Sequence, residues 1–106
     1  MRFTRKNWNK FFDGSGKRTT IRLKASRIGH HKGYAGSYMK PEVLGEFQIV
    51  SIEQKEYGKL NVFDAIEDGF STLQELKAEF ERLNGKIADE TIVYKHYLEQ
   101  IKEGKG

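Results

Sequence analysis

Cysteine is absent from this chain of 106 residues, which excludes disulfides, zinc–thiolate sites, iron–sulfur clusters and thiol catalysis. A long hydrophobic run is also missing, since no stretch approaches the roughly 20 apolar residues of a membrane span. The first ten residues, MRFTRKNWNK, lack the apolar core of a secretory signal. Pro41 is the only proline, and no repeat or proline-rich linker divides the chain. We therefore expect one soluble domain, residues 1–106, located in the cytoplasm and without membrane contact.

Charge is unevenly distributed along the chain. Residues 1–40 hold eleven basic side chains and a single acid, Asp13, which gives this part a net charge of +10. Residues 41–106 hold eight bases and fourteen acids, a net charge of −6. This asymmetry indicates a face that attracts a polyanion, with nucleic acid as the commonest candidate. The alternative is that the two parts neutralise each other after folding.

The first part of the chain predicts a helix and then a strand. In residues 4–13, Trp8, Phe11 and Phe12 share one helical face, and the glycines at positions 14 and 16 end the helix. Residues 18–24 alternate as a strand does, with Thr19, Ile21 and Leu23 on its apolar face. Its other face is cationic and is formed by Arg18, Thr20, Arg22 and Lys24.

The remaining elements complete an α+β domain. Residues 25–42 contain three glycines and no periodicity, which predicts a long exposed loop. Residues 44–57 predict a strand buried on both faces, and residues 62–68 a short helix. A longer helix begins at two overlapping capping boxes, Ser71 with Gln74 and Thr72 with Glu75, and ends at Gly85. We expect its leucine stripe over residues 73–83 to be buried. We expect Glu75, Glu79 and Glu81 on its solvated side. Residues 91–98 favour a closing strand, although Val93 and Tyr97 also fit a helix.

Two motifs carry a resemblance to a known family. They are GKRTTIR at residues 16–22 and AIEDGFSTLQEL at residues 65–76. In this order, these motifs resemble those of the ASCH domain family, over roughly residues 3–98. The resemblance implies a PUA-like open β-barrel of about five or six strands with helices packed at its ends. It also implies RNA binding linked to translation or its control, without a cofactor.

Some small ASCH proteins resemble amidohydrolases that act on acylated cytidine nucleosides through a lysine, a threonine and a glutamate. By this resemblance Lys17 would be the base, Thr20 the nucleophile and Asp68, or less readily Glu67, the acidic partner. A threonine hydroxyl needs a base to take its proton, and a lysine serves only if burial or nearby cations lower its pKa. The other interpretation is that Lys17 and Thr20 only begin a strand and contact phosphate.

A second group of residues fits nucleic-acid binding. Guanidinium groups bind phosphate bidentately, and exposed aromatic rings between cations stack on unpaired bases. The candidates are Arg18, Arg22, Lys24, Lys32, Tyr34, Tyr38 and Lys40, with the loop of residues 30–40 as a movable wall of a basic cleft.

Two other kinds of site are rejected. Gly16-Lys17 lacks the earlier glycine and the following Ser or Thr of a P-loop. His30, His31 and His96 have no metal-ligand spacing, so we expect no metal.

The leading hypothesis is an RNA- or nucleotide-binding domain, monomeric, that uses a basic cleft in RNA metabolism or translation-related regulation. The alternative is a small amidohydrolase of N4-acylated cytidine-type nucleosides. A ribonuclease and a protein–protein adaptor follow as weaker hypotheses.

Overall fold

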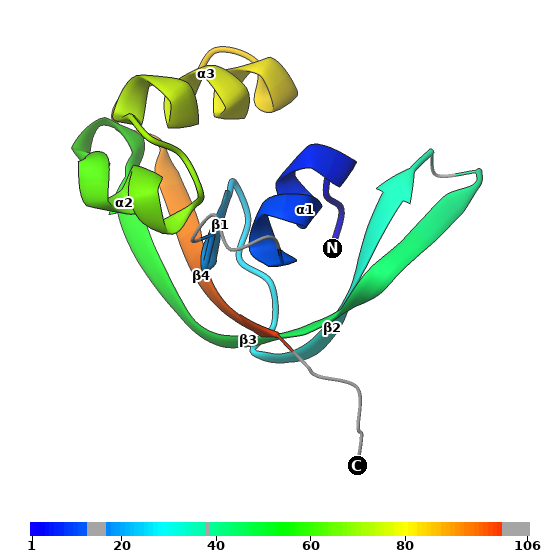
Figure 1. Cartoon of the computed structure of the whole chain (residues 1–106). Helices are drawn as coiled ribbons and strands as arrows, with labels where there is room; N and C mark the ends of the chain where they lie inside the picture. Colours follow the sequence, from blue (N-terminus) through cyan, green and yellow to red (C-terminus); the bar gives the residue numbers. More distant parts are fainter. Residues whose placement is uncertain (13–16, 38, 101–106) are drawn as a thin grey trace.

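The computed structural model of the chain describes residues 1–12, 17–37 and 39–100. Figure 1 shows a bent sheet with helix α1 inside its curve, and helix α3 above α1 at the end of the molecule that also carries α2. The elements, in chain order, are α1 (Arg5–Phe12), β1 (Thr19–Arg22), β2 (Gly29–Gly36), β3 (Pro41–Glu56), the 3-10 turn η1 (Tyr57–Lys59), α2 (Val62–Glu67), α3 (Leu73–Asn84) and β4 (Ile92–Gln100). None of these helices is long and apolar enough to cross a bilayer within the described ranges.

The described residues form an open antiparallel sheet of four strands in the order β1-β4-β3-β2. The α+β class is therefore confirmed, whereas a barrel of five or six strands is not. The strand favoured over residues 91–98 is present as β4 (Ile92–Gln100), and it lies between β1 and β3 rather than at an edge. At the edge of the sheet formed by β2, the start of the chain pairs with Tyr34 through a single parallel bridge at Arg2, which is not a further strand.

The prediction of a long loop over residues 25–42 is wrong, because β2 pairs with β3 from Gly29 opposite Ile49 to Gly36 opposite Pro41. The glycines have a packing role instead. Gly33 lies opposite Gly45, and the Trp8 ring of α1 rests against both backbones. A Cβ at Gly45 would lie 2.8 Å from Trp8 Cζ2, and one at Gly33 would overlap the same ring. Both glycines are therefore needed for α1 to dock on the sheet.

Strand β3 is buried on one face rather than on both. Phe47 and Ile49 are fully buried, but Val50 is 48% exposed. The pairing with β4 shifts between Ile49 and Ser51, so Val50 is the extra residue of a β-bulge. After the bulge the inward positions change, and Ile52 packs against the core in place of Ser51.

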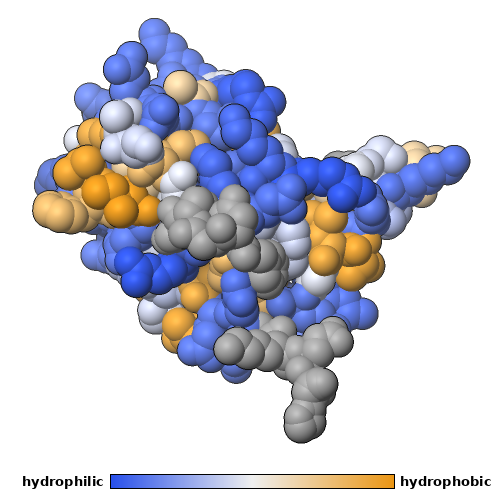
Figure 2. Space-filling view, in the orientation of Figure 1, coloured by the Kyte–Doolittle hydropathy of each residue, from blue (hydrophilic) through white to orange (hydrophobic). Residues whose placement is uncertain are grey.

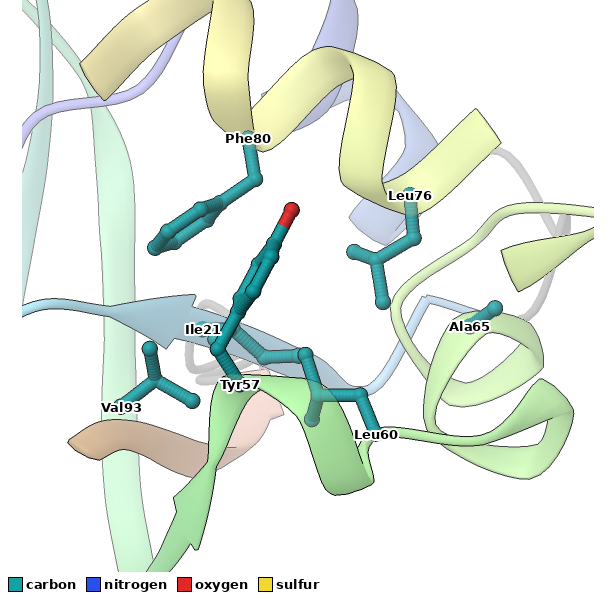
Figure 3. Close-up of a cluster of buried hydrophobic side chains, with 7 residues drawn as sticks. All are labelled: Ile21, Tyr57, Leu60, Ala65, Leu76, Phe80 and Val93. Carbon is teal, nitrogen blue, oxygen red and sulfur yellow. The ribbon is translucent and has the colours of Figure 1, made fainter. Parts of the chain in front are cut away.

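Two clusters of buried side chains form the core. The first joins α1 to the sheet and contains Phe3, Trp8, Phe11, Phe47, Ile49 and Leu98. The second, drawn in Figure 3, joins α3 and α2 to the sheet and contains Ile21, Tyr57, Leu60, Ala65, Leu76, Phe80 and Val93. The predicted helix over residues 4–13 is thus confirmed, with Trp8 and Phe11 facing the core. The prediction that Gly14 and Gly16 end this helix, and the predicted position of the Phe12 side chain, lie outside the described part of the chain.

Helix α3 begins where its capping box predicts. Thr72 Oγ1 accepts a hydrogen bond from Glu75 N at 3.1 Å, and Glu75 Oε1 accepts one from Thr72 N at 3.2 Å. The Ser71 box is not formed, since Ser71 N also donates to Glu75. Leu76 and Phe80 are buried, but Leu83 is 50% exposed, so the leucine stripe does not reach the end of the helix as predicted.

Candidate functional site

A pocket of about 450 Å³ opens between α1, β1, α3 and the end of α2. We call it the Lys17 pocket. Its apolar walls include Phe3, Phe70, Leu76, Phe80 and Leu83. Its polar lining consists of Arg2, Thr4, Asn7, Lys17, Thr20, Arg22, Asp68, Glu79 and Asn84. Lys17, Thr20 and Asp68, which the sequence suggested as one group, therefore line the same pocket.

Lys17 and Asp68 form a buried ion pair at one end of this pocket. The distance from Lys17 Nζ to Asp68 Oδ1 is 2.6 Å, and the two side chains are 3% and 8% exposed. Lys17 Nζ also donates to Thr19 O at 2.8 Å and, at a longer 3.4 Å, to Asp68 O. Gly69 follows with φ +89°, and a Cβ there would lie 3.0 Å from Lys17 Cβ. A glycine is thus required for the chain to turn this close to Lys17.

Burial brings the proton affinities of the two groups toward each other. Desolvation lowers the pKa of Lys17 and raises the pKa of Asp68, although the attraction within the pair opposes both shifts. The neighbouring cation Arg22 lowers the pKa of Lys17 further. A proton can therefore move between the two groups at a smaller cost than between exposed groups of the same kind.

Arg22 and Thr20 lie side by side on β1 and face the same pocket. Arg22 Nε donates to Thr20 Oγ1 at 3.1 Å, and the guanidinium lies 4.7 Å from the centre of the Phe3 ring. Burial lowers the pKa of Arg22 to about 10. Because Arg22 occupies one lone pair of the Thr20 oxygen, the hydroxyl proton of Thr20 points elsewhere, free to donate to a ligand or a base.

The other predicted nucleic-acid contacts lie outside the pocket. Arg18 and Lys24 are exposed and absent from its lining, since β1 spans only Thr19–Arg22 and leaves Arg18 before its start and Lys24 beyond its end. Lys32 and Tyr34 lie on β2, Lys40 precedes β3, and Tyr38 lies outside the described residues. The predicted movable wall lies in the β2–β3 strand pair, and of its described residues, 30–37 and 39–40, only Gly36 lines the pocket.

A second buried network was not anticipated from the sequence. Lys95 Nζ lies 2.7 Å from Asp64 Oδ1 and 2.6 Å from Glu67 Oε1, and Lys55 Nζ lies 2.8 Å from Asp64 Oδ2. These pairs fix α2 to β3 and β4. One signal was available: Asn61 and Asp64 have the spacing of a capping box, which the structure forms.

Glu79 was predicted on the solvated side of α3, and that prediction is wrong. Its side chain is only 16% exposed and accepts hydrogen bonds from Arg82 and from Asn7 of α1. Helical spacing alone could not reveal this, because the partner that reaches Glu79 from outside α3, Asn7, is seventy-two residues away in the sequence.

In the described part of the chain no three His, Asp or Glu residues gather as metal ligands would. His96 is fully buried, and its Nε2 accepts a hydrogen bond from Ser26 N at 2.9 Å, which occupies the lone pair that a metal would need.

No protein-family model matches the sequence, and no curated protein matches it. Among solved structures, the fold is similar to the crystal structure of an ASCH domain from Lactobacillus crispatus JV V101, with a TM-score of 0.57 and 12% sequence identity. The match covers 91% of this chain and 74% of that chain. The chain therefore has the fold of an ASCH domain, as its two motifs indicated; at this identity the likeness shows the fold alone.

The Lys17–Asp68 pair generates a stability prediction. Asp68→Asn leaves Lys17 buried without a charged partner and should lower the free energy of unfolding by about 3–5 kcal/mol, measured by urea denaturation. The double variant Lys17→Met/Asp68→Leu should lose less than the sum of the single changes, because no uncompensated charge remains. Glu42→Gln is the control, since its pair with Arg5 is exposed and should contribute under about 1 kcal/mol. A loss in Asp68→Asn no larger than in this control contradicts the assignment.

Proposed function

We propose that the protein, with its ASCH-type fold, binds a nucleotide in the Lys17 pocket, either free or as an unpaired nucleotide of RNA, in a role in RNA metabolism or translation-related regulation. The observation that carries the proposal is the combination of apolar, partly aromatic walls with Lys17 and Arg22 in one pocket. Its volume of about 450 Å³ lies within the usual range of ligand sites, about 300–1,000 Å³.

The two parts of the lining suit the two parts of a nucleotide. Phe70 and Phe80 contribute aromatic surface to the lining, and a flat base can pack against such apolar walls. Lys17 makes two short hydrogen bonds and one long one, so its third N–H can turn to an oxygen of the ligand. Arg22 has further N–H groups beyond the one that it gives to Thr20.

The charge of the pocket favours one nucleotide over a long polyanion. Its lining holds three cations, Arg2, Lys17 and Arg22, and two carboxylates, Asp68 and Glu79. With so few cations, we expect one or two phosphate contacts. Each contact contributes about 0.7 to the slope of log affinity against log salt concentration for a single strand, so the salt dependence should be shallow.

Arg22→Gln tests this proposal, with Arg18→Gln as a matched control from the same segment, because Arg18 is exposed outside the pocket. Fluorescence anisotropy with a labelled single-stranded RNA should show about tenfold weaker binding for Arg22→Gln, the loss of one hydrogen bond to a charged group. Arg18→Gln should bind like the wild type. Equal losses in both variants, or a steep salt dependence, would point to a surface groove instead of the pocket; no binding by the wild type overturns the proposal.

A second candidate function is favoured by the meeting of Lys17, Asp68 and Thr20 in one pocket: hydrolysis of an N4-acylated cytidine-type nucleoside. Thr20 Oγ would attack the acyl carbon while its proton passes to a neutral Lys17 Nζ. The C–N bond would then break, with that proton going to the leaving amine. Water would hydrolyse the resulting ester and release the carboxylic acid and Thr20. The lowered pKa of Lys17 supports this role, because it increases the fraction of neutral amine.

Incubation with N4-acetylcytidine, followed by chromatography, tests this second candidate. Thr20→Val and Lys17→Met should each lower the rate at least about a hundredfold, and the wild-type rate should rise with pH as Lys17 loses its proton. Thr19→Val is the control: within the described residues the buried Thr19 hydroxyl has no hydrogen-bond partner, so its loss should leave the rate unchanged. A wild type without product, or an active Thr20→Val variant, removes this function.

A further inference from the structure

The wall formed by α1 and α3 presents hydrogen-bond acceptors to the Lys17 pocket. Glu79 Oε1 accepts from Arg82 Nε at 2.9 Å, and Glu79 Oε2 accepts from Arg82 Nη2 at 2.8 Å and from Asn7 Nδ2 at 3.1 Å. Both Asn7 and Glu79 line the pocket. The carboxylate is therefore held in one orientation from two helices.

Two acceptor positions remain on this wall. A carboxylate has about four lone-pair positions, and three donors leave one of them, on Glu79 Oε1. Because Asn7 gives its amide N–H to Glu79, its Oδ1 is the other acceptor, and no described residue donates to it. The hydrogen bond from Arg82 holds the pKa of Glu79 below its usual range, so the group stays anionic and cannot donate. This part of the pocket favours a ligand with hydrogen-bond donors.

Glu79 lies at the rim of the pocket rather than at its closed end. It also lines a neighbouring groove together with Arg82, whose side chain is 60% exposed. Lys17 and Asp68, at 3% and 8% exposed, mark the closed end. A nucleoside that places its flat base against the apolar walls would thus leave its sugar at the rim.

We propose that Asn7 and Glu79 bind the 2′,3′-diol of a ribose, and that the ligand is therefore a ribonucleoside with both hydroxyls free. The diol supplies two donors, which matches the two acceptors, one on each residue of the hydrogen-bonded Asn7–Glu79 pair. A phosphate at the 3′ position would lack a donor there and would face the negative charge of Glu79. This inference rests on the nucleotide binding proposed above and narrows it to free ribonucleosides or ribonucleotides and to the 3′-terminal nucleotide of an RNA.

Calorimetric titration with cytidine, 2′-deoxycytidine and cytidine 3′-monophosphate tests the diol directly. The wild type should bind cytidine about tenfold more tightly than either analogue, the effect of one lost hydrogen bond to a charged group. Short RNA strands ending in a 3′-hydroxyl or a 3′-phosphate form the second arm. Tighter binding of the strand that ends in a 3′-hydroxyl would assign the RNA terminus as a ligand. Binding of cytidine but of neither RNA strand would assign free nucleosides as the ligands.

Glu79→Gln should reduce the preference for cytidine over 2′-deoxycytidine to under about threefold, because an amide is a weaker acceptor than a carboxylate. Asn7→Ala removes the second acceptor without changing the charge of Glu79, and it tests the inference if Glu79→Gln fails to fold. Glu90→Gln, an exposed change of the same charge, should keep the wild-type preference.

The outcomes separate this inference from the proposed function. Equal wild-type affinity for cytidine and 2′-deoxycytidine overturns the diol contact and leaves nucleotide binding standing. A preference that survives in both Glu79→Gln and Asn7→Ala assigns the diol to other residues and overturns the role of this wall. If no nucleoside and no RNA binds, the inference and the proposed function fall together.

Discussion

The buried ion pair between Lys17 and Asp68 is the interaction on which the rest of the site depends. It joins the segment that enters β1 to the end of α2, two parts of the chain that are fifty-one residues apart. Placing both charges out of water is costly, and a short hydrogen bond together with backbone acceptors offsets that cost only in one geometry. The pair lines the same pocket as Thr20 and Arg22, whose side is set by the pairing of β1 with β4, and it places two groups with altered proton affinity at the closed end of that pocket.

Charge also positions α2. Its inward side carries Asp64, Glu67 and Asp68 at its end, each paired with a lysine, and Ala65 is the one apolar residue of this helix among the buried core. Its outward side carries Val62, Phe63 and Ile66, from 43% to 71% exposed, and Figure 2 shows this apolar patch over α2. The basic first part and the acidic second part of the chain thus meet partly inside the fold, as the pairing of Lys17 with Asp68 shows. Part of the charge asymmetry therefore reflects pairing within the fold.

Local signals in the sequence predicted the elements, and non-local packing decided what they failed to predict. The Thr72–Glu75 capping box and the spacing of Trp8 and Phe11 depend on neighbours within one or two turns, so α3 and α1 were found. Gly33 looked like a loop residue because its reason for being glycine, the Trp8 ring, is twenty-five positions away. In the same way, the motif resemblance led to Lys17, Thr20 and Asp68, which line one pocket. Asn7 and Glu79 are seventy-two residues apart, and no local signal in the sequence joins them.

In the proposed complex, Lys17 lies at the closed end of the pocket that receives the ligand. Side-chain NMR of the lysine Cε groups during addition of cytidine 5′-monophosphate checks this position at the residue itself. We expect a saturable shift of the Lys17 signal and no shift of that of Lys59, whose side chain is 75% exposed. A nucleotide that binds and moves the signals of surface lysines, while that of Lys17 stays unchanged, would contradict this position.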